Sequence, residues 1–212
     1  VSGEVVSLWG EAPGQSYLSS SGEILLCQSA ARGDCRIEVQ ARAQTPVPSA
    51  VPVFGKGVIE NVRALAPDVL AFSLNIGRTI DFEAGQFFCL QFPQATGFRS
   101  YSIVNFEHEC SRLDFVVKRK AEGQLTPWLF QNDIEGCLVE WFGPLGRAIF
   151  QPDCTHDILC IAGGTGIAGI MSILRCATES GHFAHSKGNV FFGVRTFADA
   201  FYLTELQKLV GE

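Results

Sequence analysis

Residues 157–175 read Asp-Ile-Leu-Cys-Ile-Ala-Gly-Gly-Thr-Gly-Ile-Ala-Gly-Ile-Met-Ser-Ile-Leu-Arg, an apolar strand that passes through a glycine turn directly into an apolar helix. Within this stretch Gly164, Gly166 and Gly169 satisfy the spacing G-x-G-x-x-G, which permits a tight turn and close approach of the backbone to a pyrophosphate. The free amides and the dipole of the new helix attract an anion. The stretch predicts a site for a phosphate-bearing ligand, and a purely structural corner between strand and helix is the alternative.

The same alternation of strand and helix continues toward the end of the chain. The apolar pattern predicts strands over residues 157–162 and 189–194 and helices over 166–179 and 199–210, which is the beginning of a doubly wound parallel sheet. Parallel sheets are normally buried on both faces, and two strands alone would leave an apolar edge uncovered. We therefore expect the chain to be a fragment, or its natural C-terminus to lie beyond Glu212.

The middle of the chain carries short runs of alternating polar and apolar residues with turn residues between them. These runs are residues 57–63, 69–76, 86–92, 99–104, 112–118 and 137–142. Six strands at this spacing predict a small antiparallel barrel. Before it, residues 1–39 hold β-like pieces at 5–9, 23–27 and 36–39, and the three prolines of residues 44–52 predict an extended linker.

Composition narrows the class of protein. The net charge is −6 and there is no basic patch, so we expect no binding to nucleic acid or to an anionic membrane. The apolar run 158–174 is too short and too rich in glycine for a membrane span.

Eight cysteines without a C-x-x-C pair predict neither a disulfide framework nor a closed metal site. The first residues lack the basic start and apolar core of a signal peptide, so we expect a cytoplasmic protein, and we expect it to be a monomer.

Four motifs follow one another along the chain. They are Gly85-Gln86-Phe87, Arg99-x-Tyr101-Ser102, Gly143-Pro144-Leu145-Gly146, and Gly163-Gly164-Thr165-Gly166 with Gly193-Val194-Arg195 after it. In this order they resemble the ferredoxin-NADP reductase superfamily, most closely the reductase components of bacterial aromatic-ring-hydroxylating dioxygenases, among which the carbazole type is one candidate. Residues 24–39 resemble the last part of a plant-type ferredoxin domain.

The resemblance implies an α+β multidomain fold. An antiparallel six-stranded β-barrel that binds FAD would be followed by a doubly wound parallel α/β nucleotide domain, with the tail of a ferredoxin β-grasp domain at the N-terminus. The implied domains are residues 1–43 for the ferredoxin tail, 44–54 for the proline-rich linker, 55–152 for the FAD-binding barrel and 153–212 for the truncated NAD-binding domain.

The resemblance also implies roles at the flavin. In the family the Tyr of R-x-Y-S stacks on the flavin, so Tyr101 would lie against the ring and Ser102 would donate a hydrogen bond near N5. Arg99 would meet the FAD pyrophosphate, because a planar, permanently charged fork suits phosphate oxygens; a barrel strand with an exposed arginine is the structural alternative. Thr126 as N-cap and Pro127 at the first helical position predict a helix start that aims amides at the diphosphate, and a plain helix cap is the alternative.

The glycine turn would receive the nicotinamide cofactor, and Arg195 would face its ribose or phosphates. Gly169 stands where the family often has Pro. An acidic side chain would mark NAD at the end of the second strand, but here Arg195 comes first and Asp199 follows, so the preference for NADH over NADPH rests on the resemblance. The complete set of predicted cofactor-binding residues is Arg99, Tyr101, Ser102, Ile103, Val117, Lys118, Gly123, Gln124, Leu125, Thr126, Gly163, Gly164, Thr165, Gly166 and Arg195, with Tyr101 and Ser102 also predicted to be catalytic.

Cys27 would be the fourth ligand of a [2Fe-2S] cluster, but the three upstream cysteines of the ferredoxin pattern are absent, so the cluster is expected in the intact protein only. The implied activity is that of an NADH:ferredoxin oxidoreductase. Electrons would pass from NADH through FAD, and through the cluster in the intact protein, to a ferredoxin or to the terminal oxygenase of an aromatic-ring dioxygenase system. The alternatives are a flavin reductase or monooxygenase reductase of the same superfamily and, from another class, a non-enzymatic nucleotide-binding module.

Overall fold

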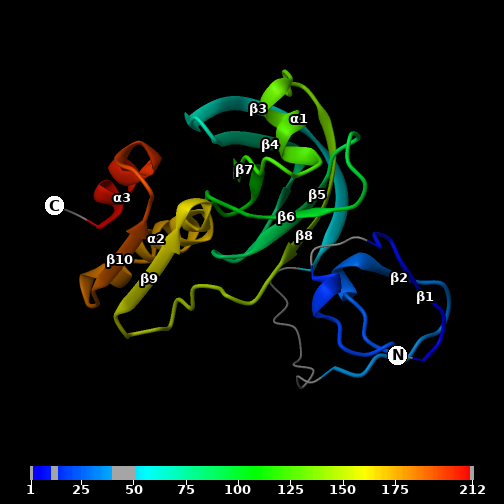
Figure 1. The fold of residues 1–212 in the computed structure, drawn as a ribbon. Helices are drawn as coiled ribbons and strands as arrows, with labels where there is room; N and C mark the ends of the chain where they lie inside the picture. The colour runs from blue at the N-terminus through cyan, green and yellow to red at the C-terminus, as the bar shows by residue number, and fades with distance from the viewer. Residues whose placement is uncertain (1, 11–13, 40–50, 211–212) are drawn as a thin grey trace.

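The computed structural model describes residues 2–10, 14–39 and 51–210. Figure 1 shows three parts: a small N-terminal block, a curled sheet in the middle, and an α/β unit that lies on the other side of the sheet from the N-terminal block. Most of the predicted linker, residues 44–54, lies outside the described residues. Its last two residues, Val53 and Phe54, already belong to the first strand of the sheet.

Six antiparallel strands form the curled sheet, as the sequence predicted. They are β3 (Val53–Ala66), β4 (Val69–Ile80), β5 (Phe87–Gln91), β6 (Arg99–Ser102), β7 (Cys110–Lys118) and β8 (Leu138–Leu145), in the order β6-β5-β8-β3-β4-β7. The edge strands β6 and β7 form no ladder within the described residues, but the amide of Val104, just after β6, donates to the carbonyl of Asp114 in β7 at 2.9 Å. The six strands therefore curl into a half-barrel, which confirms the six-stranded antiparallel barrel that the sequence predicted.

Aromatic side chains fill the inside of the half-barrel. Phe72, Phe88, Phe115 and Trp141 are each 2% exposed or less. The rings of Phe72 and Phe115 have centroids 5.7 Å apart, and Phe88 meets Trp141 edge to face at 5.7 Å. Burial of each such ring stabilises the fold by roughly 1.5–3 kcal/mol, so this cluster contributes much of the stability of the half-barrel.

The α/β unit follows the predicted alternation. It comprises β9 (Ile158–Gly163), a 3-10 turn (Gly164–Gly166), α2 (Ile167–Glu179), a 3-10 turn (His182–Ala184), β10 (Gly188–Gly193), a 3-10 turn (Phe197–Asp199) and α3 (Leu203–Val210). The two strands are parallel, as predicted, with Ile158 opposite Gly188. The predicted helix over 199–210 begins late, because Thr196 and Asp199 close a capping box around the preceding 3-10 turn.

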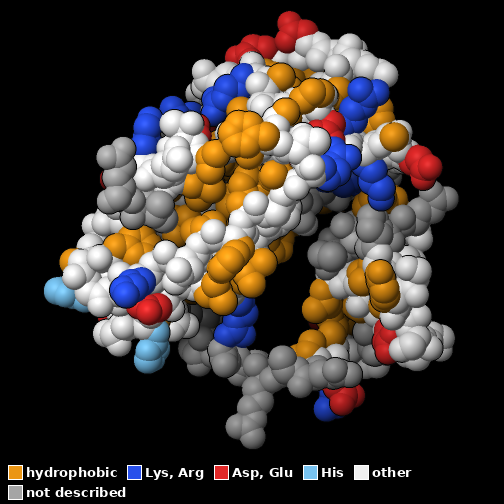
Figure 2. All heavy atoms as spheres, turned by 60° about the vertical axis from the view of Figure 1, so that its left-hand side comes forward, with side chains coloured by type: hydrophobic (Ala, Val, Ile, Leu, Met, Phe, Trp, Pro, Cys, Tyr) orange, Lys and Arg blue, Asp and Glu red, His pale blue; other side chains and the backbone are white. Residues whose placement is uncertain are grey.

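Helices cover one face of this two-stranded sheet. Cys160 and Ala162 on that face are buried together with residues of α2 and α3. On the opposite face Leu159, Ile161 and Phe191 are 63%, 73% and 63% exposed. Figure 2 shows hydrophobic side chains exposed on this side of the molecule. The sequence analysis expected an uncovered apolar edge, and the described residues show that the exposed apolar side chains lie on one face of the two strands.

The N-terminal block is less regular than its sequence suggested. β1 (Val5–Ser7) and β2 (Ser29–Ala31) pair antiparallel, and a 3-10 turn covers Gln15–Tyr17. The predicted strand over 23–27 is wrong: the chain forms a 3-10 turn at Leu26–Gln28, because the Ser29 hydroxyl donates to the carbonyl of Leu25 and favours a turn over an extended ladder. The predicted strand over 36–39 is reduced to one bridge between Ser2 and Arg36.

The α/β unit packs directly on the half-barrel. Gly85, which follows β4, has φ +102°, and a Cβ at this position would collide with the carbonyl of Ala148. Ile173 of α2 lies 3.1 Å from the same position, so the absence of a side chain at Gly85 lets the helix approach the barrel. Among the described helices none has the length and apolar character needed to span a bilayer.

Candidate functional site

β6 carries the first group of predicted residues. It pairs with β5, which sets Tyr101 opposite Phe88 and Arg99 opposite Leu90. Side chains alternate along a strand, so Arg99 and Tyr101 share one face, while Ser102 points to the other. The Tyr101 ring is half-buried and meets Phe115 at 6.4 Å in an edge-on arrangement. Burial raises the pKa of Tyr101 to about 12, so its phenol is neutral at physiological pH.

Arg99 is held in one orientation. Its Nη1 donates to the carbonyls of Thr96, Gly97 and Phe98 at 3.0, 3.2 and 3.3 Å. Trp9 of the N-terminal block lies under the guanidinium, whose central carbon is 3.9 Å from the ring centroid. Burial lowers the pKa of Arg99, but an arginine stays charged at any pH a folded protein meets. The edge formed by Nε and Nη2 has no hydrogen-bond partner within the described ranges, and it offers two parallel donors to an anion such as a diphosphate.

Ser102 faces the start of α2. A Cβ built on Gly169 would lie 3.5 Å from the Cβ of Ser102 and 3.6 Å from its hydroxyl oxygen. The Ser102 side chain is exposed. The predicted flavin residue of the barrel therefore lies against the first turn of α2, the helix that follows the glycine turn.

The glycine turn leaves open space in front of its backbone. A Cβ built on Gly163, Gly164 or Gly166 would meet no atom within 4 Å. A cavity of about 240 Å³ adjoins the turn at the carboxyl ends of β9 and β10. Its lining includes Lys118, Gly164, Gly193, Arg195, Asp199 and Phe201. Two cations beside a turn of unobstructed glycines suit a diphosphate, so the residues present fit a dinucleotide.

Carboxylates accompany those two cations. Asp68 Oδ2 lies 2.9 Å from Nη2 of Arg195 and 3.3 Å from Nζ of Lys118. Asp199 Oδ1 lies 3.9 Å from Arg195 Nη2. The Thr196 hydroxyl donates to Asp199, and this hydrogen bond is the main cause that lowers the pKa of the Asp199 carboxyl. Sequence reasoning missed Asp68, because its partners Lys118 and Arg195 come from distant parts of the chain.

The segment before β8 differs from its prediction. α1 spans Leu125–Gln131, and its N-cap is Gln124, so the prediction of Thr126 as N-cap and Pro127 as first helical residue is wrong. The Thr126 hydroxyl accepts from the amide of Lys120 at 2.9 Å and donates to the carbonyl of Lys120 at 3.0 Å. The hydroxyl thus closes the preceding loop and does not accept a hydrogen bond from an amide of the helix. Proline is still tolerated, since the amides of the first helical turn have no partner within the helix.

The remaining predicted residues are placed as follows. Ile103 and Val117 are 0% and 2% exposed, and the amide of Ile103 donates to the carbonyl of Gln86, so neither residue presents an exposed group to a ligand. Gly123 lies in the loop that Thr126 closes. Cys27 belongs to the 3-10 turn Leu26–Gln28, and its side chain lies outside the described part of the structure. Within that part, no group of three His, Cys, Asp or Glu residues could hold a metal ion.

Comparison with known proteins agrees with this arrangement. A family model of the oxidoreductase FAD-binding domain matches residues 56–150, and one of the oxidoreductase NAD-binding domain matches residues 160–212. The chain is 35% identical to the alkene monooxygenase system ferredoxin–NAD(+) reductase component of Xanthobacter autotrophicus, over 98% of this chain and 62% of that protein. It is 32% identical to a ferredoxin–NAD(P)(+) reductase of Metapseudomonas resinovorans, over 93% of this chain and 60% of that protein.

A solved structure shares the fold as well. The ferredoxin reductase in carbazole 1,9a-dioxygenase superposes with a TM-score of 0.79 at 32% identity, over 94% of this chain and 59% of the other. The chain spans about three fifths of the length of the relatives it matches. With both domain families matched in sequence order, as the four motifs predicted, the chain belongs to the ferredoxin-NADP reductase superfamily and carries its FAD-binding and NAD-binding domains.

Proposed function

We propose that this chain is the flavin and nicotinamide part of an NADH-dependent reductase. One observation carries the proposal: Ser102 of the half-barrel lies against Gly169 of α2, so that a flavin on β6 and a nicotinamide on the glycine turn would meet there. The names of two relatives support this class of reaction, since both are named ferredoxin–NAD(P)(+) reductases or reductase components. When bound, FAD accepts a hydride from the nicotinamide and passes electrons on one at a time.

The barrel residues would hold FAD at its diphosphate and at its flavin ring. Arg99 would bind the diphosphate through its Nε and Nη2 donors, which are pre-oriented by Trp9 and by three carbonyls. Tyr101 would present its neutral ring to the flavin, and Ser102 would donate to the flavin near N5 as negative charge develops there. FAD is favoured over FMN because Arg99 suits a diphosphate.

The α/β unit would hold NADH. Gly163, Gly164 and Gly166 would let its diphosphate approach the backbone, with Lys118 and Arg195 supplying positive charge. Asp68 and Asp199 already balance these cations, which disfavours a third phosphate group and so supports NADH over NADPH.

The electron acceptor would be a ferredoxin or the terminal oxygenase of an aromatic-ring dioxygenase system. A [2Fe-2S] cluster with Cys27 as one ligand would carry the electrons in the intact protein. We propose a cytoplasmic monomer with this role. The alternative of a monooxygenase reductase is supported by the similarity to the alkene monooxygenase component. Reduction of a purified ferredoxin compared with reduction of a monooxygenase hydroxylase, each by the intact protein, distinguishes the two.

Cofactor analysis tests the first half of the proposal. The purified protein should be yellow, and heat should release FAD, identified by chromatography. A colourless protein that cannot be reconstituted with FAD, or one that yields only FMN, contradicts the proposal and leaves a nucleotide-binding module as the better interpretation. Arg99→Ala should weaken FAD binding by roughly 1.5–3 kcal/mol, or about ten- to a hundredfold, which is the range for a hydrogen bond to a charged group. Arg32→Ala, an exposed arginine in the N-terminal block, is the matched control.

Rapid mixing with NADH tests the second half. Ser102→Ala should keep FAD bound but slow the loss of flavin absorbance, because its hydroxyl acts more strongly in the transition state than at rest. Equal rates for the variant and the parent would remove Ser102 from the site. Failure of NADH to bleach the flavin of the parent would contradict the reductase itself.

A further inference from the structure

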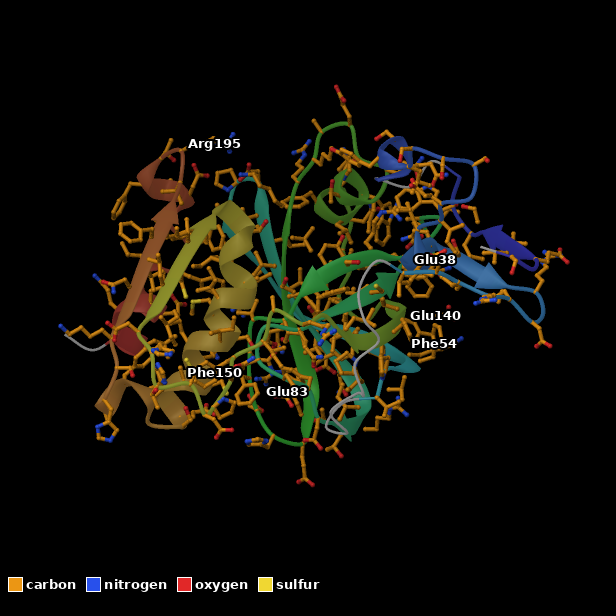
Figure 3. All side chains as sticks on the ribbon, turned by 90° about the horizontal axis from the view of Figure 1, so that it is seen from below. Glu38, Phe54, Glu83, Glu140, Phe150 and Arg195 are labelled. Carbon is orange, nitrogen blue, oxygen red and sulfur yellow. The ribbon has the colours of Figure 1, made fainter. Side chains whose placement is uncertain are left out.

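Three charged side chains meet at the rim of the nucleotide cavity, each from a different element. Asp68 lies in the turn between β3 and β4, Lys118 is the last residue of β7, and Arg195 follows β10. We call them the Asp68 cluster. One carboxylate oxygen of Asp68 serves both cations, at 2.9 and 3.3 Å. Figure 3 shows Arg195 at the end of the α/β unit.

Asp68 is poorly satisfied for a purely structural residue. Its side chain is 28% exposed, and its Oδ1 is buried without a hydrogen-bond partner among the described residues. A buried acceptor without a partner costs free energy. Exposed ion pairs return little stability, and the Arg195 side chain is 70% exposed. The arrangement therefore adds little to the stability of the fold, but it places a negative charge beside the two cations that line the nucleotide cavity.

We infer that Asp68 is a specificity-determining residue of this cavity, an inference that rests on the proposed binding of a nicotinamide dinucleotide. The Asp68 carboxylate competes with ligand phosphates for Lys118 and Arg195. It thereby lowers affinity for every phosphate-bearing ligand, and it lowers affinity most for the ligand with the most phosphate charge. Since NADP⁺ carries one phosphate group more than NAD⁺, Asp68 biases the cavity toward NAD⁺.

Electrostatics set the size of the effect. The repulsion between Asp68 and a ligand grows with the charge of the ligand and falls with ionic strength. For groups that are partly exposed, a single charge changes affinity by roughly two- to fivefold at low salt. Asp199 also faces Arg195, at 3.9 Å, but Asp68 lies 2.9 Å from Arg195 and also pairs with Lys118, so removal of the Asp68 charge acts on both cations.

Binding of NAD⁺ and NADP⁺ to the FAD-loaded protein tests the inference without turnover, because the oxidised flavin does not react with oxidised nucleotides. Titration calorimetry at low salt should show that Asp68→Asn binds NAD⁺ more tightly than the parent and gains more for NADP⁺ than for NAD⁺. The gain should shrink as salt is added. Asp68→Ser removes the same charge with a smaller side chain and should reproduce the result if Asp68→Asn folds poorly.

Asp153→Asn is the matched control, because Asp153 is an exposed residue before β9, at the opposite end of the strands from the cavity. It removes the same charge and should change neither affinity. Unchanged or weaker NADP⁺ binding in both Asp68 variants overturns the inference and makes the Asp68 cluster a bridge between the two units only. A parent that binds neither nucleotide overturns the proposed function instead, and the inference with it.

Discussion

Trp9 lies under the guanidinium of Arg99, although the two residues belong to different parts of the molecule. The Trp9 ring also lies 3.3 Å from the position of a Cβ on Gly97, so it rests on the loop that leads into β6. The Trp9 ring contacts one face of the Arg99 guanidinium, and the three carbonyls accept hydrogen bonds from its Nη1. They leave its two-donor edge available, which explains how a residue of the N-terminal block influences a site on the barrel.

Substitution of Trp9 should therefore change FAD binding. Trp9→Ala removes the stacked ring and should weaken FAD binding by about 0.5–2 kcal/mol, the range of cation–π contacts, whereas Trp9→Phe should retain much of the affinity. Quenching of flavin fluorescence on titration measures this. Tyr17→Ala, at a ring that is 87% exposed in the same block, should bind FAD like the parent. Parental affinity in Trp9→Ala would show that Arg99 needs no such support.

The motif residues could be found from sequence, and their supporting partners could not. Arg99, Tyr101 and Ser102 stand in a recognisable order, so a pattern along the chain suffices to find them. Trp9 and Asp68 act through contacts with residues far away in the sequence, and no local spacing encodes such contacts. The prediction of Thr126 as N-cap was wrong for the same reason, because a loop closure competed for its hydroxyl.

At the scale of elements, the first turn of α2 contains Gly169, and a side chain at this position would point toward Ser102 of the half-barrel. A Cβ on Gly169 would make ordinary contact with Ser102, at 3.5 Å. Alanine therefore fits there without displacing its neighbours, and it has a higher helix propensity than glycine by about 1 kcal/mol. A larger side chain at this position would cover the Ser102 hydroxyl.

Gly169→Ala should raise the melting temperature, by roughly 2–4 °C for a chain of this size. Thermal unfolding followed by circular dichroism measures the shift. Gly181→Ala is the opposing control. Gly181 lies just after the end of α2 and has φ +72°, where a Cβ is strained, so the melting temperature of this variant should fall. A lower melting temperature in Gly169→Ala would mean that α2 and Ser102 are closer than the structure indicates.

Strands and helices were predictable where their periodicity was strong. The run 112–118 alternates clearly and lies within β7, and the strand-turn-helix around the glycines was predicted almost to the residue. The predicted strand over residues 23–27 failed, because the hydrogen bond from the Ser29 hydroxyl to the carbonyl of Leu25 stabilises a turn there. Long strands were underestimated: β3 extends over Val53–Ala66 because its ends gain partners in β8 and β4.

At the scale of the whole molecule, two tyrosines, the half-buried Tyr101 of the half-barrel and the buried Tyr202 of the α/β unit, make stability depend on alkaline pH. Burial raises the pKa of both Tyr101 and Tyr202 to about 12. An unfolded tyrosine titrates near pH 10, so the folded state holds the neutral phenol more strongly. Their contribution to stability is fully present below about pH 10 and is lost as the pH rises through about 12.

Urea unfolding at several pH values should show this loss. The free energy of unfolding should decline between about pH 10 and pH 12, and the double variant Tyr101→Phe, Tyr202→Phe should decline less over the same interval. Comparing the two proteins cancels the titration of lysines and cysteines that they share. Parallel curves for the variant and the parent would contradict the burial of these phenols.

The order of strands in the half-barrel also bears on how the chain can fold while it is being synthesised. β3 pairs on one side with β4, its neighbour in sequence, and on the other with β8, where Val53 lies opposite Gly143. β5 likewise needs β8 to join the rest of the sheet. A nascent chain that has left the ribosome only as far as α1 can form two separate sheets, β3-β4-β7 and β5-β6, each with its aromatic face open. Only the emergence of β8 lets the two sheets join, because β8 is the strand that pairs with both β3 and β5.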